Sequence, residues 1–159
     1  MGNQRLQEFF LDAMRNGYAA NVEKFAIPHM KHKGISYKSK DGKLYLIDAY
    51  CVNKETDYSA GTTTIFEQGQ PVWWMSYVGY YQPDTTQYLK EALKFAYDRN
   101  LFFGGRGPDE FNISGYKYKN RSDYNSFDFF SGTETLSDIN GNMVGFHRYY
   151  GTVLGPRGG

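Results

Sequence analysis

The residues best suited to chemistry lie in two stretches of alternating sequence, residues 69–79 and residues 141–151. Alternate side chains of an extended strand point to the same face, so Trp73, Met75 and Tyr77 are expected to share one face of the first stretch. Aromatic faces of this kind can stack on a planar ligand. The alternative is that these side chains serve only as core packing.

The corresponding positions of the second stretch hold Gly145, His147 and Tyr149. Gly145 leaves space at the position that Trp73 occupies in the first stretch, and His147 supplies an imidazole that titrates near neutral pH. This asymmetry favours one pocket to which the two stretches contribute unequally. The alternative is a buried histidine whose hydrogen bonds are satisfied by its neighbours.

A third candidate is Arg106, which lies in the sequence Gly-Gly-Arg-Gly-Pro at residues 104–108. Its guanidinium could hold a phosphate or carboxylate with two hydrogen bonds, and the flanking glycines would let the backbone approach that ligand. The Lys-Ser/Thr pair of a phosphate loop is missing, and Glu110 stands at the third glycine position of a dinucleotide fingerprint. The structural alternative is an ion pair with a carboxylate such as Asp109 or Glu110.

Six residues are therefore the candidates for one aromatic ligand-binding groove. They are Tyr50, Trp73, Tyr77, Arg106, His147 and Tyr149. No catalytic residue is assigned, and neither a metal nor a cofactor is expected. His29 and His32 are three residues apart, but no cysteine or acidic cluster accompanies them.

Composition limits the partners. The 159 residues carry 18 basic and 17 acidic side chains, a net charge of +1, without a long run of one sign. A strong nucleic-acid footprint and an anionic membrane surface are therefore not expected. The single cysteine, Cys51, cannot form an intramolecular disulfide, which favours a reducing, cytoplasmic location. No stretch is apolar enough for a membrane span.

The elements that must position these residues occur twice. Three segments of the first half match three segments of the second half in the same order. The matched pairs are residues 8–18 with 87–97, 60–65 with 131–136, and 69–79 with 141–151. We predict a single α+β domain over residues 1–159, with repeats 3–81 and 83–153 related by a pseudo-two-fold axis and a flexible tail at 154–159.

Each repeat is predicted to be one helix followed by three strands. Apolar residues at helical spacing predict a helix over residues 3–16, and Asp84 with Gln87 resembles a capping box that begins the second helix. Residues 22–40 contain Pro28 and Gly34 and are expected to be a long connection. The result is a largely antiparallel sheet with both helices on one face.

The order of motifs resembles an uncharacterised bacterial domain family whose members occur alone or joined to helix-turn-helix regulators. The resemblance covers nearly the whole chain and is carried by Pro-Val-Trp-x-Met-x-Tyr-x-Gly at residues 71–79 and by Arg-Gly-Pro at residues 106–108, among other motifs. Ser76 stands where asparagine is expected, and Arg148-Tyr149 replaces a glycine pair. The resemblance implies a bacterial or phage module, and fusion to regulators favours ligand sensing over catalysis.

Three functions are consistent with the sequence. The first is non-catalytic binding, for sensing or sequestering, of a small polar and nucleotide-derived ligand in the aromatic groove. The second is an enzyme that uses His147 as a general base, assisted by Tyr149 or Asp48. The third is a protein-interaction domain whose Tyr-rich sheet face meets a partner or a second copy of the chain, which leaves a homo-oligomer open.

Overall fold

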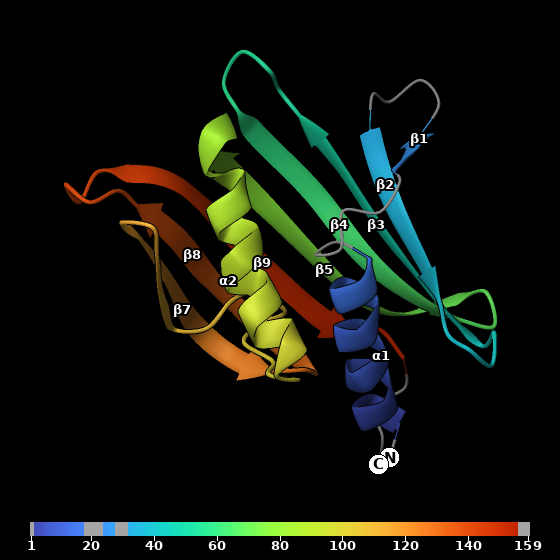
Figure 1. The fold of residues 1–159 in the computed structure, drawn as a ribbon. Coiled ribbons are helices and arrows are strands. Elements are labelled where there is room, and N and C mark those ends of the chain that lie inside the picture. Colours follow the sequence, from blue (N-terminus) through green and yellow to red (C-terminus); the bar gives the residue numbers. More distant parts are fainter. Residues whose placement is uncertain (1, 18–23, 28–31, 156–159) are drawn as a thin grey trace.

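The computed structural model describes residues 2–17, 24–27 and 32–155, which form two α-helices and a nine-stranded sheet (Figure 1). The helices are α1 (Gly2–Asn16) and α2 (Thr86–Asp98), and a short 3-10 helix (Pro83–Thr85) precedes α2. The strands are β1 (Phe25–Ile27), β2 (His32–Lys38), β3 (Leu44–Val52), β4 (Tyr58–Glu67), β5 (Gln70–Tyr81), β6 (Glu110–Ile113), β7 (Tyr116–Ser126), β8 (Phe129–Ser137) and β9 (Met143–Val153). The α+β class is confirmed.

The sheet is antiparallel throughout and has the strand order β1-β2-β3-β4-β5-β9-β8-β7-β6. Strands β5 and β9, which carry most of the candidate residues, are therefore neighbours at the centre of the sheet. Their register places Tyr77 opposite Tyr149 and Gly79 opposite His147. The two stretches that the sequence analysis singled out thus lie side by side.

Alternation along β5 separates a buried face from a more exposed one. Trp73, Met75 and Tyr77 are buried, whereas Val78 on the opposite face is 50% exposed. This period of two is the pattern of a sheet that packs on one face. The side chain of His147 lies on the buried face of the neighbouring strand, next to the ring of Tyr77.

The core lies between the buried sheet face and the helices, which run side by side in Figure 1. Phe10 of α1 is fully buried, with its ring centroid 4.8 Å from that of Trp73. Trp73 also stacks on Phe127 and Phe130, and its indole nitrogen donates to the carbonyl of Phe127 at 3.1 Å. Burial of large rings in this way supplies several kcal/mol, of the order of 2–3 kcal/mol for each side chain.

Two predictions about local structure were wrong. The expected connection over residues 22–40 contains β1 and β2, and β6 precedes the three predicted strands of the second half, so neither half is simply one helix and three strands. Gly34 fits inside β2 because the ring of Phe25 lies across it, where a Cβ atom would come within 2.4 Å of that ring. The predicted flexible tail falls largely on residues 156–159, which lie outside the described residues.

The predicted cap of α2 was also wrong. Pro83 starts a 3-10 turn that contains Asp84, and Thr85 becomes the residue that precedes the helix. The side chain of Gln87 donates to the backbone carbonyl of Asp84 at 3.2 Å instead of closing a capping box. Proline fixes its own φ, so the turn begins at Pro83, one residue before the Asp84 that the capping pattern indicates.

Candidate functional site

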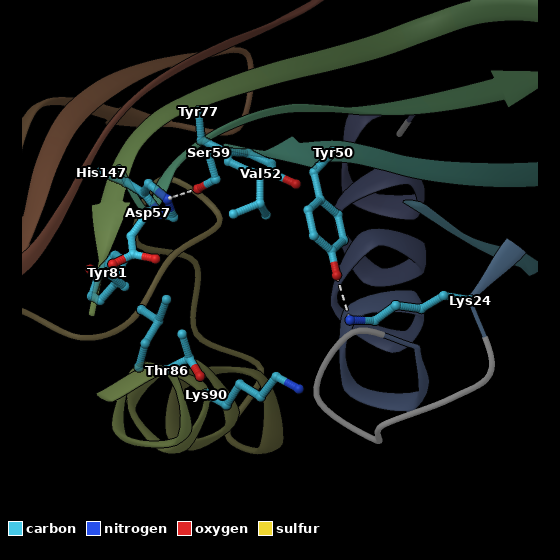
Figure 2. Close-up of a pocket in the computed structure, with 11 residues that line it drawn as sticks. Lys24, Tyr50, Val52, Asp57, Ser59, Tyr77, Tyr81, Thr86, Lys90 and His147 are labelled. Carbon is cyan, nitrogen blue, oxygen red and sulfur yellow. Dashed lines mark hydrogen bonds between the residues drawn. The ribbon is translucent and has the colours of Figure 1, made fainter. Parts of the chain in front are cut away.

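A cavity of about 270 Å³ lies between α2 and the ends of β3, β4, β5 and β9. Its walls are aromatic, and polar groups gather at two separate ends (Figure 2). The lining residues are Lys24, Tyr50, Val52, Asp57, Ser59, Tyr77, Tyr81, Thr86, Leu89, Lys90 and His147. An apolar wall with a few convergent polar groups is typical of a small-molecule site.

His147 forms one polar end of the cavity. Its Nε2 lies 3.1 Å from the hydroxyl of Ser59, shown as a dashed line in Figure 2. Its ring is held between Tyr77 and Tyr81, with ring centroids 5.5 and 4.9 Å away. Burial, together with the nearby positive charge of Arg106, lowers the pKa of His147 below its usual value, although a hydrogen bond to Glu134 opposes this shift. His147 is therefore neutral at pH 7.

Glu134 on β8 is the fully buried partner behind His147. Its Oε1 accepts hydrogen bonds from the guanidinium of Arg106, through both Nε, at 3.0 Å, and Nη2. Its Oε2 accepts the hydroxyl of Tyr118 at 2.6 Å. Burial opposes ionisation of this carboxyl, but Arg106 and the hydrogen bond from His147 outweigh it and lower the pKa of Glu134 to about 2. Glu134 is thus a buried carboxylate that is kept ionised.

The ionised Glu134 decides which nitrogen of His147 carries the proton. The Nδ1 atom lies 3.1 Å from the carboxylate oxygen, so Nδ1 must be the donor. The Arg106 Nη2 atom is 3.3 Å from the same Nδ1, but Arg106 is also only a donor and is satisfied by Glu134. The lone pair of a neutral His147 is then on Nε2, which accepts the hydroxyl of Ser59.

Two lysines form the other end of the cavity. The ammonium of Lys24 donates to the hydroxyl of Tyr50, and Lys90 extends from α2 towards the same end (Figure 2). Burial and then the repulsion of Lys24 lower the pKa of Lys90 below its usual value. An anion bound between the two ammonium groups would relieve that repulsion, so the geometry favours a negatively charged ligand group here.

A second buried carboxyl, Asp48 on β3, lies behind Tyr77. Its Oδ1 accepts the hydroxyls of Tyr77 and Thr63 at 2.9 and 2.8 Å. Its Oδ2 has no hydrogen-bond partner among the described residues. Burial raises the pKa of Asp48, and the two hydroxyl donors offset this only in part. Asp48 fixes the position of Tyr77 in the wall of the cavity.

Of the six predicted site residues, the structure brings Tyr50, Tyr77 and His147 together in the cavity wall. The sequence analysis did not identify Ser59 or Lys90 as part of the same site. Neither residue gave a signal in the sequence, because a serine at the start of a strand and a lysine on a helix are usually surface residues. Only the paired register of β4, β5 and β9 places Ser59 beside His147.

The other three predicted residues lie outside the cavity. Trp73 is in the core, and Tyr149 is buried with its hydroxyl donating to Asn120 Oδ1 at 2.6 Å. Arg106 is 3% exposed and forms an ion pair with Glu134. Glu134 is farther from Arg106 along the chain than Asp109 and Glu110, the two carboxylates considered from the sequence. The space beside Gly104 is filled by the ring of Tyr149, where a Cβ atom would come within 2.4 Å, so this glycine serves packing on the sheet.

The less buried face of the sheet carries partly exposed aromatic side chains in two rows. One row joins Tyr58, Tyr80 and Phe146, with ring centroids 5.3–6.3 Å apart. The other row runs through Trp74, Tyr150, Phe129 and Tyr124. Cross-strand aromatic pairs stabilise a sheet by themselves, so these rows are consistent with a structural role.

Two features are absent from the described residues. No helix in this part of the chain is both long and apolar enough to cross a membrane. No group of three or more His, Cys, Asp or Glu side chains is arranged there as a metal site requires. His29, one of the two spaced histidines, lies outside the described residues.

Comparison with known proteins identifies the family. The family described as Domain of unknown function (DUF5680) matches residues 48–154, so the chain belongs to this family. The expectation of an uncharacterised family is therefore confirmed. The matched range includes Ser59, Glu134 and His147 but not Lys24. No curated protein and no solved structure matches the chain.

Proposed function

We propose that this member of the DUF5680 family binds a small, planar, anionic molecule in the cavity between α2 and the sheet. The observation that carries the proposal is the two-ended cavity itself, with Lys24 and Lys90 at one end and His147 with Ser59 at the other. The aromatic wall between the ends supplies faces for a planar ring. The anionic group of the ligand lies against the lysines.

The size of the cavity limits the ligand. A volume of about 270 Å³ is at the lower end of the range for small-molecule sites, which suits a single ring system with one charged substituent. At the opposite end, Asp57 and Ser59 offer oxygen acceptors to the polar edge of a ring. A nucleoside monophosphate combines these features, and the proposal names this class.

Sensing or sequestering is the role that agrees best with the motifs of the chain. They resemble a bacterial family whose members are also joined to helix-turn-helix regulators, and a ligand-binding domain is the natural input to a regulator. A balanced net charge of +1 does not favour nucleic acid as the partner. We place the protein in the cytoplasm of a bacterium or a phage-infected cell, where nucleotides are abundant.

We also propose that the domain arose by duplication, with the cavity built from one of two related sites. In the first half, Tyr77 donates to Asp48, and a Cβ atom on Gly61 would come within 2.5 Å of the Tyr77 hydroxyl. In the second half, Tyr149 donates to Asn120, and a Cβ atom on Gly132 would come within 2.4 Å of the Tyr149 hydroxyl. The pairing of Tyr77 with Tyr149 at the centre of the sheet supports a pseudo-two-fold axis there.

Calorimetric titration with adenosine, guanosine, cytidine and uridine 5′-monophosphates tests the binding function. We expect at least one to bind, and Lys90→Ala to weaken its affinity about tenfold to a hundredfold, as loss of a charge-assisted contact does. Lys94→Ala is the matched control, because it removes the same charge one turn further along α2, outside the cavity. Failure of all four to bind at millimolar concentration would contradict the proposal, as would equal affinities of the two variants.

A further inference from the structure

Three side chains at the His147 end of the cavity form a continuous relay. The hydroxyl of Ser59 lies 3.1 Å from His147 Nε2, and His147 Nδ1 lies 3.1 Å from Glu134 Oε1. They come from β4, β9 and β8, so the arrangement depends on the fold of the whole sheet. A hydroxyl, an imidazole and an orienting carboxylate in this order are the parts of an activated nucleophile.

Each member of the relay is in the state that nucleophilic catalysis requires. Glu134 is buried, and Arg106 keeps it ionised. The ionised Glu134 fixes the Nδ1–H tautomer of His147. The neutral Nε2 is then available to accept the proton of Ser59. Ser59 is half-buried and lines the cavity, so its oxygen can reach a bound ligand.

We propose that Ser59 is a nucleophile that accepts an acyl group from a carboxylic ester bound in the cavity. This inference goes beyond the proposed binding function, because it adds to the same cavity the turnover of a carboxylic ester, a group that a nucleoside monophosphate lacks. As the Ser59 oxygen forms a bond to the acyl carbon, its proton passes to His147 Nε2. The bond between that carbon and the ester oxygen then breaks, and the leaving alcohol takes the proton from His147.

Water completes the cycle. A water molecule gives a proton to His147 and adds to the acyl carbon of the acyl-Ser59 intermediate. Collapse releases a carboxylic acid and returns the proton to Ser59, so one ester and one water yield one acid and one alcohol.

The related position of the first half lacks this chemistry. Thr63 and Met75 are paired across β4 and β5 as Glu134 and His147 are paired across β8 and β9. A thioether cannot take a proton from a hydroxyl at neutral pH, so that half contains no equivalent base. Only one of the two related sites is therefore equipped to activate a serine.

Reaction with phenylmethylsulfonyl fluoride tests the nucleophile directly, because this reagent sulfonylates activated serines and releases fluoride. We expect intact-mass measurement of the wild-type protein at pH 7.5 to show one adduct, and peptide mapping to place it on Ser59. Ser59→Ala should form no adduct, and His147→Gln should slow the reaction at least about a hundredfold, the usual contribution of a general base. Ser76→Ala, on the opposite sheet face, is the matched control and should react as the wild type does.

The result that would overturn the inference is a wild-type protein without an adduct on Ser59 in excess reagent. An unchanged rate in a folded His147→Gln would overturn it as well. Mapping on the wild-type protein does not depend on the folding of any variant. Nucleoside monophosphate binding is measured separately in Ser59→Ala. Binding that persists there while wild-type Ser59 stays unlabelled would refute the nucleophile and leave the binding function standing.

Discussion

Asp48 and Glu134 are two carboxyl groups with nearly the same burial and with pKa shifts in opposite directions. Asp48 is 1% exposed and Glu134 is fully buried, and each accepts hydroxyl donors from neighbouring side chains. Glu134 forms an ion pair with the guanidinium of Arg106. Burial raises the pKa of Asp48, whereas Arg106 outweighs burial and lowers the pKa of Glu134 to about 2.

The difference shows that hydroxyl donors alone do not lower the pKa of a buried carboxyl in this sheet. The cation that lowers the pKa of Glu134 is Arg106, which reaches Glu134 from the glycine-rich loop after α2. The charge on Glu134 affects the cavity, because it fixes the tautomer of His147 in the cavity wall. In the first half of the sheet Asp48 positions Tyr77, and in the second half Glu134 positions His147, which is a base.

Loss of Arg106 should give the largest effect. Arg106→Ala leaves the carboxylate of Glu134 buried without its cation, which typically costs about 3–5 kcal/mol of unfolding free energy. Asp48→Asn keeps an oxygen acceptor for Thr63 and Tyr77 and should cost about 1 kcal/mol or less. Urea unfolding at pH 7 measures both.

An arginine outside the network provides the control. Arg99 packs on the ring of Phe95 near the end of α2 and is exposed, so Arg99→Ala should cost less than about 1 kcal/mol. If Arg106→Ala and Arg99→Ala are equally mild, the two carboxyls do not differ in the way described.

The pH dependence of stability should have opposite signs for the two carboxyls. The folded-state pKa of Glu134 is about 2 against an ordinary 4.5, so ionised Glu134 contributes about 3 kcal/mol above pH 4.5, and this is lost as pH falls towards 2. Asp48 has a raised pKa, so its contribution is present below its ordinary pKa of 3.8 and is lost as pH rises.

Unfolding free energies measured between pH 2.5 and pH 7 separate the two cases. Relative to the wild type, Glu134→Gln should lose stability as pH rises, and Asp48→Asn should gain it. Slopes of the same sign for the two variants would refute the assignment of opposite pKa shifts.

The sequence predicted the strands that hold the cavity more accurately than the cavity itself. The alternating stretch predicted over residues 141–151 lies almost wholly within β9 (Met143–Val153), because one face of that strand is buried. β2 was missed because Gly34 and Pro28 suggested a loop, although Gly34 makes room for the ring of Phe25. The local sequence pattern predicts which side chains are buried, but it does not predict which distant ring fills the space beside a glycine.

The relay could not be predicted, because its partners meet only in the folded sheet. Glu134 belongs to the repeated segment 131–136 and was not among the candidate site residues. The charge state of Glu134 depends on Arg106, which is 28 residues away in the chain and was interpreted as a ligand anchor. Charge states of buried groups depend on tertiary contacts, and the sequence alone does not contain those distances.

The protonation of His147 is the most direct test of the difference between the two carboxyls. NMR spectra that correlate the ring hydrogens and nitrogens of histidine, assigned by comparison with His147→Gln, report which nitrogen carries the proton. We expect His147 to be neutral from pH 6.5 to pH 8, with Nδ1 protonated and Nε2 unprotonated, because ionised Glu134 accepts from Nδ1. An imidazolium in that range, or a neutral ring with the proton on Nε2, would contradict this.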